Sequence, residues 1–131
     1  MKKIGVLNQP LSRVLAGLGH MDTLVIADAG LPIPLSTERI DLAVSAGIPA
    51  FLDVLRAVLS EMEVQGAVVA EEMLQRSPQM YEALRALLGD VPIQTVPHEQ
   101  FKARTAEARA VVRTGEFTPY ANVILIAGVV F

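Results

Sequence analysis

The chain has 131 residues, of which 52% are hydrophobic, and its formal net charge is -3 at neutral pH. This length predicts a single domain over residues 1–131 with room for a hydrophobic core, and the apolar content excludes intrinsic disorder. The acidic balance argues against a nucleic-acid partner, because phosphate binding requires a basic surface. Cysteine is absent, which excludes disulfides, thiolate nucleophiles and cysteine-bound zinc.

The two ends of the sequence do not have the pattern of targeting or membrane segments. Residues 1–7 begin like a signal peptide, but Asn8 and Pro10 interrupt the apolar stretch. The apolar run at residues 123–131 is about half of the roughly 20 residues that a membrane helix needs. We therefore expect no membrane partner, and the lack of cysteine agrees with a cytoplasmic protein. The mean hydropathy of +0.44 suggests apolar surface that another copy of the chain covers.

The spacing of apolar residues predicts alternating helices and strands along the chain. Helices are expected at residues 11–18, 49–62, 78–88 and 97–108, with Gly19 and Gly89 after the first and third. Strands are expected at residues 23–27, 40–44, 66–70, 91–96 and 110–113, with a last strand from about residue 121. Two prolines make residues 31–34 an extended loop. The alternation predicts an α/β fold, a three-layer α/β/α domain with helices on both faces of a mixed sheet.

Polar residues follow two of the predicted strands, where α/β folds usually bind their ligands. Asp28 follows the strand at residues 23–27, and Arg113 ends the strand at residues 110–113. Asp28 suits hydrogen bonds from two hydroxyl groups, or the orientation of a histidine; the alternative is an ordinary turn residue before Gly30. Arg113 and Glu116 are expected to pair as a loop brace, which contributes little to stability at a surface.

A dense polar stretch at residues 113–122 runs directly into the apolar end of the chain. A polar stretch held against a buried terminal strand is a candidate binding loop. Tyr120 and Asn122 flank Ala121, so in an extended segment both side chains point to the same side. A phenol and a carboxamide each donate and accept hydrogen bonds, which suits a ligand with many hydroxyl groups. The alternative is a turn built on Pro119 with Tyr120 half-buried.

The only histidines are His20, after the first predicted helix, and His98, in the first turn of a later one. The helix dipoles favour protonated His20 and neutral His98, so a shared pocket would pair a proton donor with an acceptor. The alternative is two solvated residues at helix ends. The glutamates at residues 61, 63, 71 and 72 are interpreted as solvated helix charges. Motifs for phosphate loops and metalloproteases are absent, and the two histidines with Asp28 have no metal-ligand spacing, so neither metal nor cofactor is expected.

Five segments together resemble one known family, the D-ribose pyranases. They are Met-Lys-Lys-x-Gly-x-Leu-Asn at residues 1–8, Leu-Gly-His-x-Asp at 18–22, Ala-Asp-Ala-Gly-Leu-Pro-Ile-Pro at 27–34, Pro-His-Glu-x-Phe-Lys at 97–102 and Arg-Thr-Gly-Glu-Phe-Thr-Pro-Tyr-Ala-Asn at 113–122. The resemblance spans the whole chain, and the last segment resembles the ribose branch more than the related L-fucose mutarotases. Met21 departs from the pattern, which more often has a smaller polar residue there.

The resemblance implies a cofactor-independent isomerase that interconverts the pyranose and furanose forms of D-ribose and supplies the furanose to ribokinase. It implies His20 as the proton donor and, as the sugar-binding residues, Asp28, His98, Tyr120, Ala121 and Asn122. It also implies a homo-oligomer, a decamer of two pentameric rings, with sites near subunit interfaces. Ring opening requires a proton on the ring oxygen and loss of one from the anomeric hydroxyl. His98, Asp28, Tyr120 or a bound water would each serve as the base.

Two other functions are consistent with the same residues. A non-catalytic sugar-binding accessory of a ribose uptake system would use Asp28, Tyr120 and Asn122 but would not need proton transfer at His20. A purely structural ring protein would bind no ribose at all. The sequence also leaves open whether residues 120–122 serve the His20 of their own chain or that of a neighbour.

Overall fold

A computed structural model describes residues 1–131 and contains a six-stranded sheet in the order β2-β5-β1-β6-β3-β4. The strands are β1 (Thr23–Ala27), β2 (Glu38–Asp41), β3 (Val64–Ala70), β4 (Ile93–Val96), β5 (Ala110–Arg113) and β6 (Val123–Ala127). β6 is antiparallel to both of its neighbours, and all other pairs are parallel. Strands β1 to β5 therefore finish at one end of the sheet, the carboxyl end, where β6 begins. The opposite end is called the amino end.

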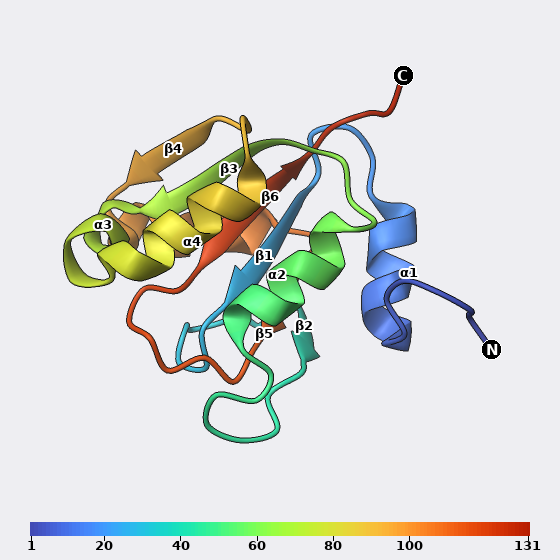
Figure 1. Cartoon of the computed structure of the whole chain (residues 1–131), viewed down its shortest axis with the longest axis horizontal. Coiled ribbons are helices and arrows are strands. Elements are labelled where there is room, and N and C mark those ends of the chain that lie inside the picture. Colours follow the sequence, from blue (N-terminus) through green and yellow to red (C-terminus); the bar gives the residue numbers. More distant parts are fainter.

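Helices cover both faces of this sheet (Figure 1), which confirms the predicted α/β layering. They are α1 (Gln9–Gly17), α2 (Phe51–Leu59), α3 (Glu71–Arg76), α4 (Pro78–Leu88) and α5 (His98–Arg104), with a 3-10 turn at Thr105–Glu107. Helices α1, α2 and α4 lie on the face that Figure 1 turns toward the reader, and α5 packs on the other. The helices are all too short or too polar to cross a membrane.

The strands separate two hydrophobic cores by the alternation of their side chains. Leu24 and Ile26 of β1 join a cluster of 23 buried residues under α1, α2 and α4. Val25, between them, joins a cluster of nine under α5. Phe51 of α2 and Phe101 of α5 are fully buried, one in each cluster. Burying an aromatic side chain of this size stabilises the fold by about 1.5–3 kcal/mol.

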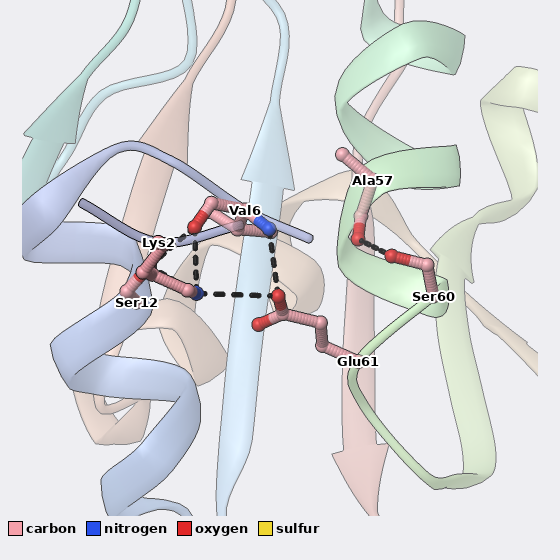
Figure 2. Close-up of polar contacts among 6 residues, drawn as sticks. All are labelled: Lys2, Val6, Ser12, Ala57, Ser60 and Glu61. Atoms are coloured by element: carbon pink, nitrogen blue, oxygen red, sulfur yellow. Dashed lines mark hydrogen bonds and ion pairs between the residues drawn. The ribbon is translucent and has the colours of Figure 1, made fainter. Parts of the chain in front are cut away.

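The residues before α1 are fixed by a small polar network (Figure 2). Glu61, which follows α2, accepts hydrogen bonds from the Val6 N–H at 2.6 Å and from Lys2 Nζ at 3.4 Å. The Val6 N–H is the main reason why the pKa of Glu61 lies below its ordinary value. Gly5 has a φ of 80°, and a Cβ there would lie 2.0 Å from Glu61 Oε1. Lys2 and Gly5, from the segment at residues 1–8 that resembles the family, therefore help to hold the start of the chain against Glu61.

Two predicted elements end at different residues from those expected. The strand predicted at residues 40–44 exists but with other bounds, since β2 spans Glu38–Asp41. It stops at Asp41 because its neighbour β5 ends at Arg113, and Asp41 Oδ1 accepts the Ala43 N–H at 3.0 Å and turns the chain. Helix α1 ends at Gly17, and Gly19 is not its left-handed cap. The Gly19 N–H instead donates to Asp22 Oδ2 at 2.8 Å.

Two further differences concern α3 and the end of the chain. Helix α3 was not predicted, since its six residues are too few to show a helical period. The terminal strand begins at Val123 and ends at Ala127, so it is shorter than the apolar run. Val130 and Phe131 are exposed, at 86% and 101%. The end of the chain is therefore an apolar tail at the amino end of the sheet and not a buried strand.

Candidate functional site

Strands β1 and β6 are joined at the carboxyl end of the sheet by a polar pair, Asp28 and Asn122. Asn122 Oδ1 accepts the Asp28 N–H at 2.8 Å, and its Nδ2 donates to Asp28 Oδ2 at 2.9 Å. The Gly30 N–H donates to Asp28 Oδ1 at 2.9 Å. Asn122 is 1% exposed, whereas Asp28 is half-buried. The carboxylate of Asp28 is thus oriented within the chain, and each of its oxygens keeps a lone pair that these bonds do not use.

Residues 120–122 form a tight turn that leads into β6. Tyr120 has a φ of 61°, and the Asn122 N–H donates to the Tyr120 carbonyl at 2.8 Å. The predicted extended arrangement, with Tyr120 and Asn122 on one side, is therefore wrong. The turn is required because Asn122 is tied to Asp28 while the chain reverses into β6. Ala121 is fully buried, so only its backbone is available to a ligand.

The start of helix α4 supports this turn. Ser77 Oγ donates to the carbonyl of Pro119 at 2.6 Å and makes no capping bond to α4 itself. Ser77 is the residue before the first helical position of α4, but its hydroxyl holds the loop that carries Tyr120.

His98 begins helix α5, directly after β4, and its ring contacts Tyr120. The two rings meet edge to face with centroids 5.0 Å apart, and the His98 ring stacks on Phe101 at 6.2 Å. His98 Nδ1 is buried without a hydrogen-bond partner. Nε2 is therefore the ring nitrogen available to a ligand. The His98 N–H donates to both carboxylate oxygens of Glu72, at 3.0 and 3.1 Å.

His20 lies at the amino end of the sheet, away from these residues. His20 comes before β1 and Asp28 comes directly after β1. The five residues of β1, which span roughly 16 Å, therefore separate the two side chains. The His20 side chain is exposed, and its Nε2 is 2.9 Å from Gln65 Oε1. Gln65 Nε2 in turn contacts the sulfur of Met21 at 2.7 Å. Within one chain, His20 and His98 do not share a pocket.

The polar loop between β5 and β6 is held by Glu116 and Arg113, but not by a bond between them. Arg113 pairs with Asp41 at 3.1 Å and donates from Nε to the carbonyl of Ala29 at 3.0 Å. The predicted Arg113–Glu116 pair is wrong, because Arg113 ends β5 beside Asp41 at the end of the neighbouring strand.

Glu116 instead caps helix α2 from a distant part of the chain. Its Oε1 accepts the Phe51 N–H at 3.0 Å, and its Oε2 accepts the Thr118 hydroxyl at 2.8 Å. Helix α2 needs this acceptor, since its own N-cap residue is Ala50. Partial burial raises the pKa of the Glu116 carboxyl, but the hydrogen bonds from Phe51 and Thr118 outweigh burial and hold the pKa below its ordinary value.

Two adjoining depressions lie over this loop, with volumes of about 390 and 660 Å³. Both are lined by residues 116–119; the smaller one also contains Asp28 and Arg113, and the larger one Ser77. Neither contains His98 or Asn122, so a single chain does not enclose the whole polar set. The structure has no group of three or more histidine, aspartate or glutamate side chains arranged to hold a metal ion.

The fold and this site define a class: a small α/β protein that gathers hydrogen-bonding side chains at the carboxyl end of its sheet. The chain belongs to the RbsD / FucU transport protein family, which matches residues 1–130.

Named relatives agree with this assignment. The chain is 58% identical to the D-ribose pyranase of Geobacillus kaustophilus, over 100% of this chain and 96% of that protein. It is 59% identical to the D-ribose pyranase of Symbiobacterium thermophilum over 100% of both. The structure of Bacillus subtilis RbsD complexed with D-ribose matches 100% of both chains, with a TM-score of 0.97 and 47% identity. The fucose mutarotase of Streptococcus pneumoniae in complex with L-fucose also covers 100% of both, with a TM-score of 0.85 and 26% identity. The resemblance to the D-ribose pyranases is confirmed.

Sequence reasoning misassigned two residues that shape the site, Glu72 as a solvated charge and Glu116 as the partner of Arg113, and missed a third, Gln65. Glu72 and Glu116 bind backbone N–H groups of distant helices, and Gln65 contacts His20. The position of Glu72, shortly after a buried strand, was the available signal, because side chains there face the carboxyl end of the sheet. Glu116 lies in the polar stretch at residues 113–122, but nothing in the sequence indicated Phe51 as its partner, and Gln65 gave no comparable signal.

Proposed function

We propose that this chain is a D-ribose pyranase, a cofactor-independent isomerase that interconverts the pyranose and furanose forms of D-ribose in the cytoplasm. One observation carries the proposal: the oriented Asp28–Asn122 pair lies at the same end of the sheet as His98 and Tyr120. The chain is also 58% identical over its whole length to a D-ribose pyranase. The furanose that the reaction forms is the substrate of ribokinase.

The chemistry follows from acid–base catalysis. His20 donates a proton to the ring oxygen while the anomeric hydroxyl gives its proton to a basic group of the site or to a bound water, so the bond between C1 and the ring oxygen breaks and the aldehyde forms. Closure through a different hydroxyl reverses both transfers and gives the other ring. Asp28, His98, Tyr120 and Asn122 hold the remaining hydroxyls, and Ala121 contributes through its backbone. Proton transfer of this kind accelerates a reaction by about 10²–10⁴-fold.

A neighbouring copy of the chain supplies the His20 of each site. Within one chain, the whole length of β1 separates His20 from Asp28. The two depressions at the carboxyl end also leave out some of the sugar-binding residues, such as His98 and Asn122. Exposed apolar side chains occur at both ends of the sheet: Met21 and Phe131 at the amino end, and Phe117 at the carboxyl end. A head-to-tail contact between copies covers both surfaces and closes into a ring. The proposed assembly is a decamer of two pentameric rings.

Exchange spectroscopy by NMR on D-ribose tests the function. We expect the protein to accelerate exchange between the pyranose and furanose signals of ribose, and to act less on L-fucose. Binding of ribose without faster exchange would instead identify the sugar-binding accessory, and the absence of binding would leave only a structural ring protein. Sedimentation of the same sample checks the proposed decamer.

A further inference from the structure

Glu72 has one partner in the structure, the backbone of His98. Both of its carboxylate oxygens accept the His98 N–H, at 3.0 and 3.1 Å. Glu72 takes part in none of the ion pairs. It is half-buried, whereas the adjacent Glu71 is exposed and makes no side-chain hydrogen bond. The half-buried carboxylate of Glu72 is thus committed to a single backbone donor.

This bond joins two turns at the carboxyl end of the sheet. Strands β3 and β4 are parallel neighbours, and Ala70 and Val96 are the last residues in register. Glu72 and His98 each lie two residues beyond that last pair. The hydrogen bond from the His98 N–H to Glu72 therefore links the two segments just after their strands end. Helix α5 gains an acceptor for its first N–H, since its N-cap residue is Pro97 and provides no side-chain cap.

The backbone of His98 determines where its ring lies. The ring is confined between Phe101, which stacks on it, and Tyr120, which meets it edge to face. Nδ1 is buried without a partner, so the ring presents Nε2 outward in one orientation. A histidine side chain has only two torsions, so a shift of the His98 backbone moves Nε2 and withdraws support from Tyr120.

We propose that Glu72 is a positioning residue of the ribose site, acting through the backbone N–H of His98. The proposal rests on the function proposed above and adds a residue to it. Glu72 holds His98 and Tyr120 in the arrangement that binds sugar, and it does not touch the sugar itself. Because Glu72 acts on a sugar-binding residue and makes no contact with the proton donor His20, it affects substrate binding more than proton transfer.

The test compares Glu72→Ala, Glu72→Gln and the matched control Glu71→Ala. Exchange rates at a series of ribose concentrations give KM and kcat for each. We expect Glu72→Ala to raise KM about tenfold, the effect of losing one charge-assisted hydrogen bond, while kcat is retained. The amide oxygen of Glu72→Gln accepts the same N–H and keeps KM near that of the unmodified protein. Glu71→Ala changes neither constant.

The two histidines allow a second, spectroscopic measurement. We expect Glu72→Ala to shift the imidazole NMR signals of His98 and to leave those of His20 in place. Should Glu72→Ala fail to fold, Glu72→Asp replaces it, since its shorter side chain reaches the N–H less well and gives an intermediate KM. An unchanged KM and an unchanged His98 spectrum in the folded variant would overturn the proposal, as would equal losses in Glu72→Ala and Glu72→Gln.

The unmodified protein separates this proposal from the proposed function. If it does not accelerate ribose exchange, the function fails, while the His98 spectrum of Glu72→Ala still tests the link between Glu72 and His98. If it does accelerate exchange and Glu72→Ala matches it in KM, only the positioning role fails.

Discussion

The two ends of the sheet present their functional groups in different ways. At the carboxyl end, Asp28 and Asn122 hydrogen-bond each other, and the ring of His98 packs on that of Tyr120. At the amino end, His20 is exposed and its ring has one hydrogen-bond partner, Gln65. The proposed binding groups are therefore oriented by several contacts within the chain, whereas the proposed proton donor has only the contact with Gln65. A single subunit has both halves of the proposed ribose site but holds them at opposite ends of β1.

The largest expected effect comes from removing the proton donor. His20→Ala should keep the fold and ribose binding but lower the exchange rate by about 10²–10⁴-fold, the usual contribution of a positioned acid. NMR exchange spectroscopy measures the rate, and saturation-transfer measurements on ribose check binding. Turnover equal to that of the unmodified protein would reject His20 as the acid.

The His20→Ala variant also tests whether the amino end of one copy meets the carboxyl end of another. Asp28→Asn removes the carboxylate at the other end of the sheet, and each variant alone sets a baseline. Mixed assemblies, formed by refolding the two variants together, should regain activity, because some sites then combine an intact His20 with an intact Asp28. No gain over the baselines would show that each site uses residues of one chain.

Asn122→Ala should weaken ribose binding and stability together. It leaves the Asp28 N–H without its acceptor and frees the Asp28 carboxylate, and an unsatisfied buried donor costs about 1–3 kcal/mol. We expect a lower melting temperature and a KM raised about tenfold or more. Thermal unfolding and exchange kinetics measure the two effects. A raised KM without any loss of stability would mean that Asn122 contacts sugar but does not organise the turn.

Glu116→Gln should reduce stability in a way that depends on pH. The pKa of Glu116 is lowered in the folded protein, so its contribution is fully present above the unfolded pKa of about 4.3 and is lost as the pH falls through the folded value. The variant should be less stable by about 1 kcal/mol at neutral pH, the typical value of a helix cap, and the difference should shrink below about pH 4.

Denaturant unfolding between neutral and acidic pH measures the effect of Glu116→Gln. The exposed Glu82 on α4, which makes no side-chain hydrogen bond, supplies the control variant Glu82→Gln. A stability difference that stays constant with pH would contradict the assigned role of the carboxylate.

The smallest effect is expected at Gln65. Gln65→Ala removes the single hydrogen bond to the His20 ring, so we expect a fall in kcat of about two- to fivefold, a fraction of the contribution of an acid catalyst. KM should not change, because Gln65 contacts His20 and Met21 and none of the proposed binding groups. A change in KM alone would place Gln65 with the binding groups instead.

Local patterns were sufficient to predict much of the fold and the candidate residues. The strand at Thr23–Ala27, the helix at Pro78–Leu88 and the polar residues after the strands all follow from spacing over a few positions. The turn at Tyr120 does not, since it depends on the bond between Asn122 and Asp28, which are 94 positions apart. The role of Glu116 likewise depends on Phe51, 65 positions away. Contacts of this kind are fixed only when the sheet has formed.

The antiparallel course of β6 has a consequence for the proposed ring. β6 begins at the binding turn of its own subunit and ends beside the turn that carries His20, since the Met21 N–H donates to the Ala127 carbonyl at 2.9 Å. β6 and β1 each have five residues and, in the proposed ring, together form a rigid spacer between two proposed ribose sites. The distance between successive sites in such a ring is set by strand length, and insertions in the surface loops would leave it unchanged.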